Sequence, residues 1–233
     1  AKDLKLTDNV GGAGLVVGNG SLVKDCVASG NTTGFYCGDR SQISNCIATV
    51  NADFGFNCTS FVNLLDCTAS RNTGTAGIRV QNNCTILRCS STRNLPSGFG
   101  IYTDDGGIIT DCTASNNGGF GIYSISGNLT VTSSAANSNA GTGIWAYRSS
   151  VSQCTASFNT SIGIFSNAGS VTNCTVNSNS STGIYAQFGC ITHSNALSNG
   201  GTDIYVQEGV AAFCRAINAD TYNATLTGNR FGP

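Results

Sequence analysis

The residues best suited to acid–base chemistry are the adjacent aspartates Asp104 and Asp105, in the segment IYTDDGG. Paired carboxylates act as general acid and base when a further titratable group lies within hydrogen-bond reach of the same substrate. The chain contains one histidine, His193. We favour a solvated aspartate pair in a turn, assign no catalytic residue, and regard Asp104 and Asp105 as the positions at which one would be sought.

The chain offers few metal ligands. Calcium requires six to eight oxygen ligands, whereas Asp39, Asp104, Asp105 and Glu208 are spread over the sequence. The 12 cysteines and the histidine include no CxxC or Cys/His cluster with the spacing of a zinc site. We therefore predict no metal and no cofactor.

The elements that position these residues follow from an internal repeat of 20 to 23 residues. Each repeat contains three short β-type segments separated by Gly, Asn or Asp, none long enough for a helix. Such segments bury their apolar side only if successive coils stack in register. The sequence thus predicts an all-β, single-stranded parallel β-helix, a solenoid of about ten coils. The coils open at Leu15, Phe35, Phe56, Ile78, Ile101, Ile122, Ile144, Ile164, Ile184 and Ile204.

Three further repeat positions, occupied by alanine, asparagine and cysteine, predict inward or turn columns. At about 4.8 Å per coil, the four coils between Asp104 and His193 separate these residues by about 19 Å along the axis, outside hydrogen-bond reach. Asparagine tolerates a left-handed backbone, and its amide can bond the amide of the next coil. We expect a small-residue column at Ala48, Ala69, Ala114, Ala135, Ala156, Ala196 and Ala216. We expect a turn column at Asn31, Asn51, Asn72, Asn94, Asn117, Asn139, Asn159, Asn179, Asn199 and Asn218.

Most of the cysteines share one repeat position. A free cysteine behaves as a small buried hydrophobe, and side chains in register point side by side, which strains a disulfide. We therefore favour a stack of reduced thiols over disulfides, with Cys37 and Cys58 the best candidates for a bridge. The column comprises Cys26, Cys46, Cys67, Cys89, Cys112, Cys154, Cys174 and Cys214, with Ser133 and Ser194 completing it.

The second position of each coil alternates with an inward residue and is expected to point outward. Seven of these nine residues are aromatic: Tyr36, Asn57, Arg79, Tyr102, Tyr123, Trp145, Phe165, Tyr185 and Tyr205. Aromatic rings at coil spacing offer a stacking platform for a glycan or a contact face for another subunit. The alternative is that stacked rings simply reinforce the ladder. Our candidate ligand-binding residues are Tyr102, Tyr123, Trp145, Phe165, Tyr185 and Tyr205.

From Leu15 to Asn223, the N-C-T-x-S-x-N and G-I-Y repeats resemble the right-handed parallel β-helix superfamily, the pectate-lyase-like fold. The resemblance implies the handedness and the architecture rather than an activity. Members that process acidic polysaccharides carry clustered carboxylates near a His, Lys or Arg. Asp104 and Asp105 resemble the paired aspartates of polygalacturonases, but the rest of that motif is missing. We lean against an enzyme.

Composition excludes other classes. Only 10% of residues are charged, the net charge is −1, and the 11 basic residues are scattered, which disfavours binding to nucleic acid. No apolar run approaches the length of a membrane span. We expect an N-terminal partial coil over 1–14, the β-helix over 15–223 and a C-terminal tail over 224–233.

These observations lead to one hypothesis and two alternatives. The leading hypothesis is a non-catalytic extracellular or cell-surface β-helix that self-assembles into a fibre, sheath or adhesin. The first alternative is a protein that binds or processes a polysaccharide along the aromatic residues. The second is an ice-binding solenoid, because Thr and Ser recur on one outward face, for example at Thr68, Ser70, Thr113 and Ser115.

Overall fold

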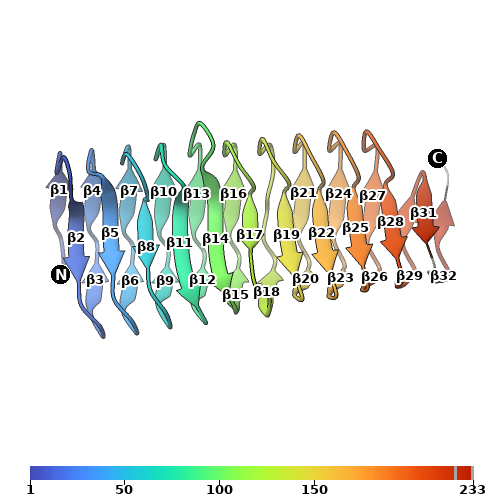
Figure 1. Ribbon diagram of the computed structural model, residues 1–233, viewed down its shortest axis with the longest axis horizontal. Helices are drawn as coiled ribbons and strands as arrows, with labels where there is room; N and C mark the ends of the chain where they lie inside the picture. The colour runs from blue at the N-terminus through green and yellow to red at the C-terminus, as the bar shows by residue number, and fades with distance from the viewer. Residues whose placement is uncertain (223–224, 232–233) are drawn as a thin grey trace.

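The computed structural model describes residues 1–222 and 225–231 and forms a parallel β-solenoid of about 11 turns. The predicted all-β fold is confirmed, and the predicted ten coils is close to the observed number. Figure 1 shows the coils stacked along one axis, with the two ends of the chain at opposite ends of the rod. No helix occurs among the described residues, so none there is long and apolar enough to cross a membrane.

The coils contribute strands to three parallel sheets, and the coil that contains Ala135 joins sheet 3 only by isolated bridges. Sheet 1 carries the predicted aromatic positions. It contains β2 (Ala13–Val17), β5 (Thr33–Cys37), β8 (Phe56–Cys58), β11 (Ala76–Asn82), β14 (Phe99–Asp105), β17 (Ile122–Ser124), β19 (Ile144–Tyr147), β22 (Ile164–Asn167), β25 (Ile184–Gln187), β28 (Ile204–Gln207) and β31 (Ala219–Tyr222).

Sheet 2 follows sheet 1 in every coil. It contains β3 (Leu22–Lys24), β6 (Gln42–Ser44), β9 (Asn63–Leu65), β12 (Thr85–Leu87), β15 (Gly107–Thr110), β18 (Leu129–Thr132), β20 (Ser150–Ser152), β23 (Ser170–Thr172), β26 (Cys190–Thr192), β29 (Val210–Ala212) and β32 (Thr225–Thr227).

Sheet 3 has two parts, joined by single bridges from Ala135 to Thr113 and Thr155. The first part contains β1 (Lys5–Thr7), β4 (Val27–Ser29), β7 (Ile47–Thr49), β10 (Thr68–Ser70), β13 (Ser90–Thr92) and β16 (Thr113–Ser115). The second part contains β21 (Thr155–Ser157), β24 (Thr175–Asn177), β27 (Asn195–Leu197), β30 (Arg215–Ala216) and β33 (Arg230–Phe231).

All three corners between sheets share one backbone design, in which a residue with positive φ precedes an inward residue, and two of these corners are named by their inward residues. The thiol corner, between sheets 2 and 3, has Asp25, Asn45, Asp66, Arg88, Asp111, Ser133, Gln153, Asn173, His193 and Phe213 at the positive-φ position. The amide corner, between sheets 3 and 1, has Val50, Arg71, Arg93, Asn116, Ser138, Phe158, Ser178 and Ser198 there. His193 is therefore a turn residue, as its repeat position suggests.

The amide corner takes its name from the inward asparagines. Asn117 donates its backbone N–H and its Nδ2–H to Oδ1 of Asn139, at 3.1 and 3.0 Å, and Asn139 repeats both bonds to Asn159. The predicted amide column is therefore a continuous ladder. Our expectation that these asparagines hold the left-handed backbone is wrong, because the residue before each one holds it. The ladder ends when Asn199 bonds the carboxylate of Asp203 instead of Asn218.

A closing glycine follows the ladder asparagine in most coils, because the ladder leaves no room for a side chain there, and Asp203 takes this position where the ladder ends. A Cβ on Gly121 would lie 2.6 Å from the carbonyl oxygen of Gly143 and 2.7 Å from Nδ2 of Asn139. The backbone of sheet 1 thus packs directly on the asparagine amides.

The inward isoleucines of sheet 1 are buried and paired in register, as predicted. The predicted alanine and thiol columns need one correction. Ala136, not Ala135, is the buried alanine of its coil, and Ser134, not Ser133, completes the thiol column. Ser133 instead occupies the positive-φ position, so the prediction was off by one residue.

All 12 cysteines lie among the described residues and are free thiols, 11 of them buried and Cys190 exposed. In the thiol column Cys89 donates to the carbonyl of Leu87 in its own coil and accepts the N–H of Cys67 in the preceding coil, both at 3.4 Å. Burial raises the pKa of Cys84 to about 11. Cys37 and Cys58 lie opposite each other in register as unlinked thiols.

Paired strands lie on both sides of the predicted domain boundaries. β1 pairs with β4 before residue 15, and β32 pairs with β29 after residue 224. The boundary between residues 223 and 224 itself lies outside the described residues, and the division into three parts stays a prediction.

Candidate functional site

The aromatic residues form one continuous row on the outer face of sheet 1. Register pairs Tyr102 with Tyr123, Tyr123 with Trp145 and Phe165 with Tyr185. Ring centroids are 5.5 Å apart between Tyr102 and Tyr123 and 4.0 Å apart between Trp145 and Phe165. We call Tyr102, Tyr123, Trp145, Phe165, Tyr185 and Tyr205 the aromatic row.

The rings shield one another, so the row is less exposed than its outward direction suggests. Tyr102, Tyr123, Trp145, Tyr185 and Tyr205 are half-buried. Phe165, at 8% exposure, is buried. Trp145 stacks with both Phe120 and Phe165, whereas Tyr185 meets Phe165 and Tyr205 edge to face. A ligand would therefore contact mainly the outer edges of the rings.

Polar side chains run beside the aromatic row. Asn167 donates Nδ2–H to Oε1 of Gln187 at 2.7 Å, and the hydroxyl of Tyr185 donates to Oε1 of Gln207 at 2.9 Å. These groups retain further donors and acceptors that suit sugar hydroxyls.

Asp104 belongs to this face, where it is ion-paired. Its Oδ2 lies 2.7 Å from Nη2 of Arg79, which also donates to Asn57. The Arg79 guanidinium lies 5.8 Å from the ring centre of Tyr102. Burial raises the pKa of the Tyr102 hydroxyl, and the negative charge of Asp104 raises it further. Asp104 therefore anchors a local network, and sequence reasoning missed its arginine partner.

The structure does not bring the other acid–base candidates to Asp104. Asp105 accepts a hydrogen bond from Asn128 of the following coil, at 3.4 Å. His193 lies at the thiol corner, on another side of the solenoid, with its ring 5.2 Å from that of Phe213. Asp104 and Asp105 thus have separate partners, and His193 belongs to neither group.

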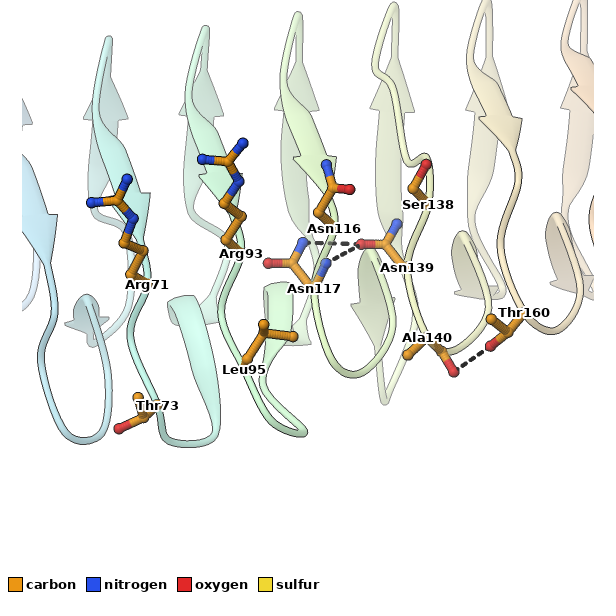
Figure 2. Close-up of a pocket in the computed structure, with 10 residues that line it drawn as sticks. All are labelled: Arg71, Thr73, Arg93, Leu95, Asn116, Asn117, Ser138, Asn139, Ala140 and Thr160. Atoms are coloured by element: carbon orange, nitrogen blue, oxygen red, sulfur yellow. Dashed lines mark hydrogen bonds between the residues drawn. The ribbon is translucent and has the colours of Figure 1, made fainter.

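A groove of about 650 Å³ lies at the amide corner. Figure 2 shows Arg71 and Arg93 projecting in the same direction from adjacent coils, with Leu95 below Arg93 and the Asn117–Asn139 amides beyond. Its walls also include hydroxyl side chains. The lining residues are Arg71, Thr73, Arg93, Leu95, Asn116, Asn117, Ser138, Asn139, Ala140 and Thr160.

A second groove, of about 690 Å³, continues from the first toward sheet 1. The two grooves share Thr73 and Ala140, and the second is lined by Phe99 and Phe120. Phe120 stacks on Trp145 with ring centroids 5.8 Å apart. A path therefore runs from the two arginines to the aromatic row.

A family model described as a right-handed β-helix region matches residues 56–196, more than half of the chain. The chain belongs to the right-handed β-helix family. This assignment confirms the resemblance on which the handedness was based. No curated protein matches the sequence.

Solved structures similar to this β-helix share its fold at low sequence identity. The Dettilon tailspike protein gp208 matches with a TM-score of 0.65 and 12% identity over 97% of this chain and 61% of its own. ORF18 of Geobacillus virus E2 has a TM-score of 0.58 and 13% identity over 99% of this chain and 52% of its own. The β-helix thus spans less than two thirds of either viral chain.

The A-module of the Azotobacter vinelandii mannuronan C-5 epimerase AlgE4 is also similar to this β-helix. It has a TM-score of 0.53 and 13% identity, over 95% of this chain and 87% of its own. At such identities these likenesses describe the fold.

The described part of the β-helix contains no group of three or more His, Cys, Asp or Glu side chains that could hold a metal ion. The groove at the amide corner was not predicted. Its one visible signal in the sequence is the equivalent position of Arg71 and Arg93 in adjacent repeats, each directly before a column asparagine.

Proposed function

We propose that this β-helix is an extracellular or cell-surface protein that binds a polysaccharide along sheet 1. The observation that carries the proposal is the aromatic row, which runs in register over consecutive coils beside amide and hydroxyl side chains. Rings and amides at coil spacing suit a polymer whose sugars recur along one direction.

The similar structures support the same class of role. One is a tailspike, and another acts, by its name, on mannuronan. The proposal requires binding alone, because Asp104 is held in an ion pair with Arg79 and Asp105 bonds a different coil.

The test is affinity electrophoresis of the protein in gels that contain one polysaccharide at a time, neutral or acidic. Trp145→Ala is expected to lose at least about tenfold in affinity for the polysaccharide that retards the wild type, as for a central aromatic anchor. Far-UV circular dichroism establishes that the variant is folded.

The matched control is Phe61→Ala, because Phe61 is an exposed aromatic residue at the corner between sheets 1 and 2, outside the aromatic row, at 50% exposure. It should bind as the wild type does. Equal retardation of the wild type and Trp145→Ala by every polysaccharide would contradict the proposal.

A second proposal is the self-assembly expected from the sequence. Its support is the exposure of large apolar side chains at the corners, with Phe158 at 66%, Phe188 at 50% and Phe213 at 60%. These three residues lie at three different corners, so they offer separate apolar contact points to another copy of the chain rather than one contiguous patch. Sedimentation over a concentration series tests it: association should increase with concentration and weaken in Phe158→Ser, and a monomer throughout would contradict it.

A further inference from the structure

Arg71 and Arg93 form a pair of like charges with no acidic partner. Backbone pairing of β10 with β13 places Ser70 opposite Thr92, so the two arginines that follow these residues are neighbours on adjacent coils. The coil spacing is about 4.8 Å. Both side chains are exposed, and they run in the same direction (Figure 2). Within the described residues, neither guanidinium makes an ion pair or donates a hydrogen bond.

Three arginines elsewhere in the chain have partners. Arg79 pairs with Asp104, and Arg88 holds Asp66 through two hydrogen bonds at 2.8 and 3.1 Å. Arg40 lies over the ring of Phe61. Arg215 and Arg230, opposite each other on β30 and β33, make no ion pair among the described residues either, but they line neither groove, whereas Arg71 and Arg93 line the groove at the amide corner.

The surroundings of the pair suit an anionic group on a sugar. The described residues that line the groove include no acid, while Thr73, Asn116, Ser138 and Thr160 offer hydroxyls and an amide. Leu95 supplies an apolar wall, at 49% exposure. The adjoining groove leads to Phe99 and Phe120. Guanidinium groups bind carboxylates and sulfates through paired N–H donors.

We infer that Arg71 and Arg93 form an anion-binding site for carboxylate or sulfate groups of a glycan, which the aromatic row holds by its sugar rings. The inference rests on the proposed function and adds the charge of the ligand to it. Because the whole chain has a net charge of −1, attraction of anions here is a local property of the corner.

The experiment compares polymers that share one backbone: dextran, carboxymethyl dextran and dextran sulfate. The wild type is expected to bind at least one charged polymer about tenfold more tightly than dextran, and Arg71→Ala/Arg93→Ala is expected to lose that difference. The carboxymethyl and sulfate arms distinguish the two sources of negative charge. Lys24→Ala/Arg40→Ala removes the same total charge elsewhere and should retain the preference.

A second measurement uses small anions, glucuronate and inorganic sulfate, and follows the arginine Nε–Hε signals by NMR. Selective shifts of Arg71 and Arg93 support the site even if no polymer binds, an outcome that would defeat the proposed function alone. Trp145-dependent binding of a polymer that is unaffected by Arg71→Ala/Arg93→Ala, with no shift of these signals, would overturn the anion site and leave the proposed function standing. Equal loss in both charge-removal variants would also overturn it.

Discussion

The thiol corner and the amide corner have the same backbone design but opposite chemistry. Each places a positive-φ residue before an inward one in nearly every coil. At the thiol corner the inward residue is a cysteine, and the outward Asp66 and Arg88 of adjacent coils form an ion pair. At the amide corner the inward residue is a hydrogen-bonded asparagine, and the outward Arg71 and Arg93 repel each other.

The two corners differ in the partners of their inward and outward side chains. At the thiol corner Asp66 and Arg88 pair with each other, and Cys89 donates to a carbonyl group of its own coil and accepts an N–H group from the preceding coil. The amide corner joins its coils through buried amides, and its Arg71 and Arg93 line a groove without an ion pair among the described residues. Both corners therefore link successive coils by hydrogen bonds, and the amide corner in addition carries a groove lined by two arginines.

The largest effect on stability is expected from shortening one ladder amide. In Asn139→Ser, the buried N–H and Nδ2–H of Asn117 lose their acceptor. Unsatisfied buried donors of this kind cost about 1–3 kcal/mol each, so the loss of two should lower the free energy of unfolding by about 2–6 kcal/mol. Denaturant titration measures it. Asn195→Ser, at an exposed site of β27, is the control and should change little.

The binding difference between the corners should disappear when the charge pattern of the thiol corner is copied. Arg71→Asp places an acid one coil before Arg93, in the order of Asp66 and Arg88. Affinity for the charged dextran that the wild type prefers should fall by at least about tenfold, or about 1.4 kcal/mol. Arg40→Asp makes the same change of charge at another corner. Unchanged binding by Arg71→Asp would show that the arginine pair of the amide corner does not set the preference for the charged dextran.

The inward column of the thiol corner should tolerate the substitution that the ladder does not. Ser134 already accepts the N–H of Cys112 at 3.1 Å and donates to the carbonyl of Thr132 at 2.8 Å. Cys154→Ser can make the same bonds, and its free energy of unfolding should stay within about 1 kcal/mol of the wild type. A loss as large as that of Asn139→Ser would remove the distinction between the columns.

The smallest effect concerns pH. Hydrogen bonds from Arg88 lower the pKa of Asp66 below its ordinary value of 3.8. A carboxyl whose folded pKa is lowered stabilises the fold above the unfolded pKa, and this contribution disappears as the pH falls through the folded pKa. Melting temperatures of Asp66→Asn and the wild type should therefore converge below pH about 4. A constant difference down to pH about 2 would show that the ion pair does not set the pH dependence.

Some of the fold could be predicted because it repeats. The isoleucines of sheet 1 and the asparagines of the ladder recur at fixed spacing, and stacking in register turns spacing into columns. The error at Ser133 and Ala135 arose where SSAA offers two serines and two alanines in succession. The spacing from the inward Val131 would have resolved it, since Val151 and Cys154 are also three residues apart.

The sequence by itself determined the solenoid, its inward columns and the outward direction of the aromatic row, because alternation along a strand and the coil period are properties of spacing. Only the tertiary structure decided which outward side chains meet. The pairing of Arg79 with Asp104, the shielding of Phe165 and the groove beside Arg71 and Arg93 depend on how long side chains lean between coils and where loops leave space. A repeat constrains the backbone closely and leaves those directions free.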